Sequence, residues 1–260
     1  MKDGFIKAAA AAVDIKVADC VYNREKIVEK ARELSRQGAR ILVFPELCIT
    51  GYTCQDLFWQ ERLLDSAREQ LLKAAEELKD VEGLIFLGLP LEFDGKLYNT
   101  AAVLCKGEIL GIVPKHCLPN YGEFYEARHF ASGKGVQGTV LLGGRQVPFS
   151  SQLLFTCEDM PSLRVAAEIC EDLWAPNPPS VSHAMAGATV IVNLSASDET
   201  VGKADYRREL VKSQSARLLC AYVYATAGYG ESTQDLVFGG QHLICENGVV
   251  LGEAKMFQNE

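Results

Sequence analysis

The chain reads Val-Ala-Ala-Glu-Ile-Cys-Glu-Asp-Leu-Trp over residues 165–174. The first half of this stretch is a short apolar run, which is typical of a buried strand. The polar residues after Cys170 indicate a turn at which a helix can begin. The stretch therefore predicts one strand-turn-helix unit of a fold that combines sheets with helices, and it places a cysteine at the turn.

A thiol at such a turn is held by a rigid element and is expected to point outward. Backbone N–H groups at a helix N-terminus favour thiolate over thiol, and the thiolate is the nucleophilic form of cysteine. A lone cysteine is more often a buried structural residue. Two further segments favour a functional role for Cys170.

The first of these segments carries a carboxylate. Residues 41–44 form an apolar run that predicts a buried strand, and Pro45 ends it because proline cannot donate to the sheet ladder. Glu46 follows at the carboxyl end of this strand, and residues 47–52 after it are largely apolar. A partly desolvated carboxylate at this place is suited to act as a general base.

The second segment carries an amine. Residues 111–114 form another apolar run that ends in proline, and Lys115 follows it. The next stretch, residues 120–130, is dense in aromatic and charged side chains, as expected for a binding loop.

Glutamate, lysine and cysteine thus follow three strand ends in that chain order. The set resembles the Glu-Lys-Cys signature of the nitrilase (carbon-nitrogen hydrolase) superfamily. The resemblance is closer to the glutaminase domain of glutamine-dependent NAD synthetases, and it covers nearly the whole chain. It is carried by residues 44–47, 51–52, 114–115 with 118–126, 169–174, 193–197 and 221–237.

We expect an α/β fold in a single domain over residues 1–260. With 48% hydrophobic and 23% charged residues, the chain can bury a sizeable core. Strands are predicted at 6–13, 41–44, 84–89, 97–104, 108–113, 165–169, 190–194, 221–225 and 240–245, with further strand-like segments within 140–155. Helices are predicted at 24–37, 62–79, 181–188 and 206–219, and a hairpin turn at 246–248. The resemblance implies a four-layer α-β-β-α sandwich that assembles as a homo-oligomer.

The resemblance also implies a reaction, the hydrolysis of the L-glutamine side-chain amide to glutamate and ammonia. Cys170 would attack the amide carbon, Glu46 would transfer the protons, and Lys115 would stabilise the oxyanion. The superfamily often has a second glutamate that orients the lysine. Glu126 matches this place best, and Glu123 is close enough to compete.

Recognition of glutamine requires groups for an α-ammonium and an α-carboxylate. The resemblance gives as candidates Tyr121, Glu171, Ser197 and Lys203, with Tyr52 and Phe124 as walls. Asp172 is interpreted as a cap of the helix that follows Cys170. The aromatic residues at 222–224 are interpreted as strand packing.

Composition excludes several function classes. A formal net charge of −8 without a Lys/Arg cluster disfavours nucleic-acid binding. The nine cysteines contain no CxxC pair, and with four histidines they form no metal-binding spacing, so no metal site is expected. The odd number of cysteines suits a reducing cytosol, so we expect a cytoplasmic protein. No segment has the apolar length of a membrane span, and the alanine run at 8–12 is too short for a secretory signal.

One departure from the resemblance concerns the C-terminal end. NAD synthetases of this type continue with another strand and with an ATP-dependent synthetase domain that has a Ser-Gly-Gly-rich loop. The Gly-Gly pairs at 143–144 and 239–240 lack the flanking residues of such a loop. We therefore expect the final strand and the synthetase domain to be absent here. The amidohydrolase step would need no cofactor, ATP and magnesium would belong to the synthetase domain, and that domain would receive the ammonia and switch on the glutaminase.

Three alternatives remain open. A free-standing amidase of the superfamily, acting on an ω-amide or an N-carbamoyl amine, fits the missing synthetase domain but not the segments around Tyr121 and Trp174. A non-catalytic scaffold has no reason to retain Glu46, Lys115 and Cys170 together. A cysteine-based redox protein ranks last because no CxxC pair is present.

Overall fold

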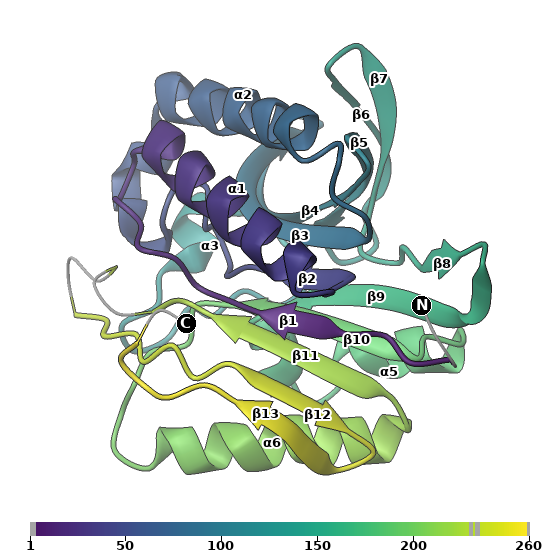
Figure 1. The fold of residues 1–260 in the computed structure, drawn as a ribbon. Coiled ribbons are helices and arrows are strands. Elements are labelled where there is room, and N and C mark those ends of the chain that lie inside the picture. The colour runs from purple at the N-terminus through teal and green to yellow at the C-terminus, as the bar shows by residue number, and fades with distance from the viewer. Residues whose placement is uncertain (1–3, 229–230, 232–234, 259–260) are drawn as a thin grey trace.

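The computed structural model describes residues 4–228, 231 and 235–258. Two sheets pack face to face, and helices cover the outer face of each sheet (Figure 1). This arrangement confirms the predicted four-layer α-β-β-α sandwich. Residues 229, 230 and 232–234, which belong to one of the segments that carry the resemblance, lie outside the described residues.

The first sheet lies below helices α1 (Cys20–Arg36) and α2 (Glu61–Glu77) in Figure 1. Its strands follow the order β1-β2-β3-β4-β5-β7-β6. Their bounds are β1 Ala8–Ala10, β2 Ile41–Val43, β3 Leu84–Phe93, β4 Lys96–Cys105, β5 Glu108–Pro114, β6 Gln137–Leu142 and β7 Arg145–Ser150. Strands β1, β2 and β3 are parallel, and β3, β4 and β5 form an antiparallel meander.

The second sheet packs on helices α5 (Pro179–Met185) and α6 (Lys203–Leu218). Its strands follow the order β13-β12-β11-β10-β9-β8. Their bounds are β8 Phe155–Cys157, β9 Met160–Ile169, β10 Val190–Ser195, β11 Ala221–Thr226, β12 Leu243–Glu246 and β13 Val249–Glu253. Three short helical segments lie in loops, namely η1 Tyr52–Trp59, α3 Glu126–His129 and α4 Glu171–Trp174.

The core consists of three apolar layers. Strand β2 shows how they arise, because Ile41 and Val43 pack between the two sheets whereas Leu42 packs toward α1 and α2. A third layer fills the space between the second sheet and α6, with Ile191 and Val211 among its residues. A strand buried on both faces reads as a continuous apolar run, which is the pattern that predicted these strands.

The carboxyl ends of the central parallel strands meet at one end of the sandwich. In the second sheet, β9 and β10 are parallel neighbours, so Cys170 leaves β9 beside Leu194 and its amide donates to the Leu194 carbonyl at 3.0 Å. The Glu46 amide, just beyond β2 of the first sheet, donates to the Ser195 carbonyl at 3.2 Å. The two sheets are therefore hydrogen-bonded to each other at the residues that the sequence singled out.

Several boundaries differ from the sequence predictions. Helix α1 begins at Cys20, before the predicted residue 24, because the Asp19 carboxylate caps it by accepting from the Tyr22 amide at 3.0 Å. The predicted first strand at 6–13 is reduced to Ala8–Ala10. Helix α6 begins at Lys203 rather than at 206, and the turn at 246–248 joins β12 to β13, a strand that the pattern did not predict. Segments η1 and α3 were also not predicted, since neither has a regular apolar period.

Among the described residues, no helix has both the length and the apolar character needed to cross a lipid bilayer.

His242 joins the two sheets from within the interior. Its ring nitrogens Nε2 and Nδ1 lie 3.1 Å from the Ala12 amide nitrogen, beyond β1, and 3.2 Å from the Thr226 amide nitrogen in β11. Both neighbours are N–H donors, so a protonated ring would face donors on both sides, and burial lowers the pKa of His242 to about 4. The neutral ring therefore makes its full contribution to the free energy of unfolding above about pH 6.5, which is the pKa of histidine in the unfolded chain. This contribution is lost as the pH falls toward about 4.

Replacement of His242 with glutamine should reduce the acid sensitivity of the fold. Between pH 7 and pH 5, the free energy of unfolding of the wild type should fall by about 2 kcal/mol more than that of H242Q, because only the wild type must keep this ring neutral. Denaturant unfolding at the two pH values measures the difference. An equal loss in both proteins would contradict the prediction.

Candidate active site

Cys170 sits on a sharp turn between β9 and α4. Its backbone has φ 44° and ψ −100°, a left-handed conformation that a non-glycine residue adopts only when its surroundings enforce it. The enforcing contacts include two acceptors for the Cys170 amide, the Leu194 carbonyl and Asn193 Oδ1, each at 3.0 Å. The thiol lines a cavity, although the residue is only 5% exposed.

The environment of Cys170 does not favour thiolate. Burial raises the pKa of the thiol above its ordinary value, and the Glu46 charge raises it further, while Lys115 and a hydrogen bond from Ser195 oppose these effects. The expectation that helix N-terminal groups hold a thiolate is therefore wrong for the free protein. The physical reason is that α4 spans only four residues, whereas the thiol is desolvated and faces a carboxylate. Cys170 needs a base to become nucleophilic.

Lys115 lies between two buried carboxylates. Its Nζ is 2.6 Å from Glu46 Oε1 and 2.7 Å from Glu126 Oε1, and all three side chains are almost completely buried. Burial raises the pKa of Glu126 to about 7; Lys115 opposes this shift and the Glu46 charge adds to it. The structure thus brings Glu126 to the lysine. Glu123 instead lies beside Asp198, and the hydrogen bond between these carboxyl groups raises the pKa of Glu123.

Glu46 presents one free oxygen. Its Oε1 accepts from Lys115 Nζ and from Asn99 Nδ2, each at 2.6 Å. Its Oε2 is buried and has no hydrogen-bond partner within the part of the chain that the structure describes. A buried carboxylate oxygen without a hydrogen-bond partner carries a free-energy penalty, and this penalty becomes smaller when the oxygen accepts a proton. Glu46 Oε2 is therefore the atom suited to accept the proton of the nearby thiol.

Tyr52 does not line the cavity, contrary to the expectation that it forms a wall. Its hydroxyl donates to Glu126 Oε1 at 2.7 Å, and its ring packs edge-on against Phe124 and Phe238. Tyr52 therefore supports the carboxylate that pairs with Lys115.

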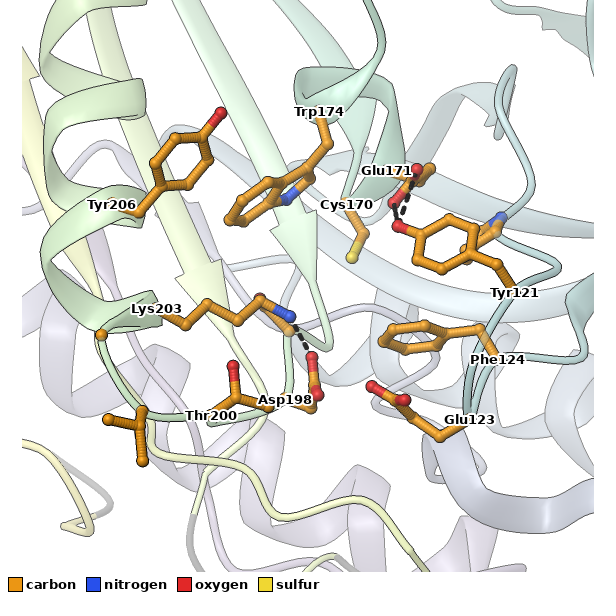
Figure 2. A pocket seen from close by; sticks show the side chains of 14 residues that line it. Tyr121, Glu123, Phe124, Cys170, Glu171, Trp174, Asp198, Thr200, Lys203 and Tyr206 are labelled. Carbon is orange, nitrogen blue, oxygen red and sulfur yellow. Dashed lines mark hydrogen bonds and ion pairs between the residues drawn. The ribbon is translucent and has the colours of Figure 1, made fainter.

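The cavity beside Cys170 has a volume of about 440 Å³. Figure 2 shows that its labelled side chains come from the loop before α3, from α4 and from the segment at the start of α6. The residues that line the cavity include five of the predicted substrate-binding residues together with charged and aromatic neighbours: Tyr121, Glu123, Phe124, Glu171, Trp174, Ser197, Asp198, Lys203 and Tyr206.

Both signs of charge occur in this cavity. The Tyr121 hydroxyl donates to the Glu171 carboxylate, with distances of 3.0 and 3.1 Å to its two oxygens. Lys203 Nζ pairs with Asp198 and lies over the rings of Phe124 and Trp174, 5.8 and 5.4 Å from their centroids (Figure 2). The arrangement suits a small zwitterion whose ammonium and carboxylate groups lie close together.

Asp172 and Asn99 were not identified as site residues. The expectation that Asp172 caps α4 is wrong, because its carboxylate accepts from amides outside that helix, those of Ile169, His116 and Cys117 at 2.9, 3.1 and 2.6 Å. It thereby ties the turn of Cys170 to the residues that follow Lys115. The available signal for Asp172 was a carboxylate two residues after Cys170, in the polar turn. Asn99 gave only the weak signal of an amide within an apolar strand.

Gly88 in β3 holds the turn of Glu46 in place. A Cβ atom at this position would lie 2.3 Å from the Leu47 amide nitrogen and 2.6 Å from the Pro45 carbonyl oxygen. Both atoms belong to the backbone, so the turn itself would have to move. Only glycine allows this approach of β3 to residues 45–47.

The substitution G88A should lower the free energy of unfolding by about 1–3 kcal/mol or more, the usual cost of overpacking. It should also displace Glu46. Denaturant unfolding checks the stability, with G252A as the matched control because a Cβ at Gly252 would meet nothing within 4 Å. Equal unfolding midpoints for G88A and G252A would contradict the prediction.

No group of three or more His, Cys, Asp or Glu side chains that could hold a metal ion occurs among the residues that the structure describes.

The chain matches the model of the family described as carbon-nitrogen hydrolase over residues 7–260. A protein of Mycobacterium tuberculosis named glutamine-dependent NAD(+) synthetase is 45% identical over 254 residues, which are 98% of this chain and 37% of the relative. A protein of Aquifex aeolicus with the same name is 32% identical and is matched over 96% of this chain and 40% of its own length. This chain therefore spans about two fifths of the length of these relatives.

Solved structures of similar proteins share the fold of this chain. A glutamine-dependent NAD(+) synthetase from Cytophaga hutchinsonii superposes with a TM-score of 0.87 at 32% identity, covering 98% of this chain and 41% of that one. An amidase of the nitrilase superfamily from Nesterenkonia superposes with a TM-score of 0.76 at 22% identity over 98% of this chain and 88% of that one, which shows a shared fold. These similarities confirm the resemblance predicted from the sequence. The chain belongs to the carbon-nitrogen hydrolase family.

Proposed function

We propose that this chain hydrolyses the side-chain amide of L-glutamine to glutamate and ammonia and supplies the ammonia to an ATP-dependent NAD synthetase domain. One observation carries the proposal. A buried Glu46–Lys115 pair adjoins a cysteine at the edge of a cavity that contains both a carboxylate and an ammonium group. The names of the relatives support glutamine as the amide donor.

The first half of the reaction forms a thioester. Glu46 Oε2 accepts the thiol proton as Cys170 Sγ attacks the amide carbon, and the carbonyl oxygen becomes an oxyanion. The Lys115 ammonium, which two carboxylates hold in place, and the backbone N–H groups after Cys170 stabilise that charge. Glu46 then gives its proton to the departing nitrogen. The C–N bond breaks, ammonia leaves, and the γ-glutamyl group remains on sulfur.

The second half releases glutamate. Glu46, again ionised, removes a proton from a water molecule that attacks the thioester carbon. The C–S bond breaks as the new tetrahedral intermediate collapses, and the proton held by Glu46 returns to the sulfur. The thiol is thereby restored, in the protonation state that its buried environment favours.

We assign the residues that recognise the two charged groups of glutamine by the charges in the cavity. Glu171, which Tyr121 holds in place, would bind the α-ammonium group, and Lys203 with Ser197 would bind the α-carboxylate. The amidohydrolase step uses no cofactor in this proposal, and ATP and magnesium act at the synthetase domain. We further propose that the protein is cytoplasmic, in keeping with its nine free cysteines, and that it assembles as a homo-oligomer, as the resemblance implies.

The test is ammonia release from L-glutamine beside a panel of other ω-amides and N-carbamoyl amines, with and without a separately produced synthetase domain. We expect weak release that is selective for glutamine from the chain alone and faster release when the synthetase domain is present. Selective release from a different amide would overturn the substrate assignment and favour the free-standing amidase. No release from any substrate, even with the synthetase domain, would overturn the enzymatic proposal.

A further inference from the structure

The apolar half of β9 and the apolar run of β10 each contain one buried polar residue, Glu168 and Asn193. These two residues are paired in the register of the strands, and Tyr222 of β11 lies on the same face of the sheet. All three residues are at most 1% exposed. A carboxylate or an amide in a core lowers stability unless hydrogen bonds satisfy it. The partners of these side chains therefore indicate what they do.

A series of hydrogen bonds joins these side chains to the backbone of Cys170. The Cys170 amide donates to Asn193 Oδ1 at 3.0 Å, and Asn193 Nδ2 donates to Tyr222 Oη at 3.1 Å. The Tyr222 hydroxyl donates to Glu168 Oε1. The other carboxylate oxygen, Glu168 Oε2, accepts from the Ser180 amide of α5 at 2.8 Å. The series thus runs without a break from α5 to the turn of Cys170.

The direction of each bond follows from which atoms can donate. A backbone amide can only donate, so Asn193 must turn its oxygen toward Cys170 and its NH₂ group toward Tyr222. The Tyr222 oxygen can accept from that NH₂ group only if its own hydrogen points elsewhere, and the Glu168 carboxylate takes this hydrogen. Burial raises the pKa of Glu168, and the hydrogen bonds from Tyr222 and Ser180 oppose this shift.

The turn of Cys170 needs such support. Its φ of 44° lies in the left-handed region, which a residue with a Cβ atom keeps only when several contacts enforce it. One acceptor of the Cys170 amide, the Leu194 carbonyl, belongs to the backbone of β10. Asn193 supplies the other acceptor from a side chain. Without it, the turn would relax toward an ordinary conformation and move the sulfur atom away from Glu46.

We propose that Asn193 is a positioning residue for the proposed reaction, because its Oδ1 atom holds the turn that aims Cys170 Sγ at Glu46 Oε2. Tyr222 and Glu168 act through Asn193 by fixing the orientation of its amide. We call Glu168, Tyr222 and Asn193 the amide clamp, and no proton moves along it. The effect of the clamp on turnover rests on the proposed function, whereas its effect on the reactivity of the sulfur does not.

The clamp gives the Tyr222 hydroxyl a role beyond strand packing. The Tyr222 ring packs in the apolar layer between the second sheet and α6, and a phenylalanine would fill the same space. It would leave Asn193 Nδ2 without its acceptor, so the amide would no longer be held with its oxygen toward Cys170. The variant Y222F therefore tests the orientation of Asn193, and N193A removes the acceptor itself.

The first measurement is the kinetics of ammonia release from glutamine with the synthetase domain present. In Y222F and N193A, kcat should fall about 5-fold or more, the size of one hydrogen bond, and KM should change by less than about 2-fold. The reason for the small change in KM is that neither residue lines the cavity. The matched control is Y98F, which removes the hydroxyl of a buried tyrosine from β4 in the other sheet and should keep the wild-type kcat.

The double variant N193A/Y222F tests whether Tyr222 acts through Asn193. It should be no slower than N193A, because the hydroxyl has nothing to orient once the amide is gone. Losses that multiply in the double variant would overturn this link. A kcat of N193A equal to that of the wild type and Y98F would overturn the positioning role.

The second measurement is alkylation of Cys170 by iodoacetamide near neutral pH, with the modified cysteine identified by mass spectrometry. Alkylation in Y222F and N193A should be about 5-fold slower or more than in the wild type and Y98F, because Glu46 no longer receives the thiol proton. Near-UV circular dichroism should confirm native packing in every variant. Alkylation of N193A at the wild-type rate or faster would overturn the proposal. The readout needs no glutamine, so slower alkylation in a chain that releases no ammonia would disprove the proposed function while supporting this inference.

Discussion

Replacement of Cys170 with alanine is expected to eliminate ammonia release from glutamine, since loss of a catalytic nucleophile costs on the order of 10⁶-fold in rate. The remaining site would still present Glu46 and Lys115, but no covalent intermediate could form. The fold should persist, because the substitution removes only a sulfur atom at the edge of a cavity. Ammonia release and thermal unfolding of C170A measure the two parts of this prediction.

The matched control for this variant is C117A. Cys117 lies two residues after Lys115, but its thiol is only half-buried and its pKa is raised to about 11 by burial and by Asp172. We expect C117A to release ammonia at close to the wild-type rate. Full activity in C170A, or its loss in C117A with Cys170 intact, would show that the nucleophile has been wrongly assigned.

Replacement of Lys115 with methionine is expected to damage both activity and stability. The oxyanion loses its positive partner, and two buried carboxylates, Glu46 and Glu126, lose the charge between them. Removal of one partner from a buried ion pair costs about 3–5 kcal/mol. The proposed glutaminase reaction should fall below detection, and denaturant unfolding should show a loss of stability of that size.

The loss of stability in K115M should depend on pH. Without the lysine, the pKa of Glu126 should rise further above its value of about 7. A carboxyl group whose folded-state pKa lies above its unfolded value contributes stability at low pH that is lost as the pH rises. K115M should therefore be more strongly destabilised at pH 8 than at pH 5.

The surface variant K73M provides the comparison, because Lys73 pairs with Glu69 on the exposed face of α2. Its free energy of unfolding should change by less than about 1 kcal/mol at either pH. If K115M and K73M unfolded at the same denaturant concentration at pH 8, the Lys115 ion pairs would be shown to contribute nothing to the fold.

The sequence alone predicted most of the strands and helices and the three principal site residues, and the resemblance implied the four-layer arrangement. It could do so because their signals are local. Strand β2 is a continuous apolar run, the carboxyl half of β9 is apolar except for Glu168, and Pro45, Pro114 and the polar turn after Cys170 mark where strands end. The order of Glu46, Lys115 and Cys170 along the chain then supplied the resemblance to the carbon-nitrogen hydrolases.

The tertiary structure alone decided how the site is completed. Whether Glu123 or Glu126 pairs with Lys115 could not be read from two glutamates three residues apart, because the answer depends on how the loop before α3 folds over β5. Asn99 reaches Glu46 across 53 residues of sequence, and nothing in the pattern of β4 marks that contact.

The protonation of Cys170 was decided in the same way. The local pattern of strand, turn and helix predicted a thiolate, but burial and the nearby Glu46 carboxylate make the thiol the favoured form. The sequence determines which side chains lie at the ends of strands, because strand ends have local signals. Desolvation and charge at a site depend on which distant segments pack around it, and only the folded chain brings those segments together.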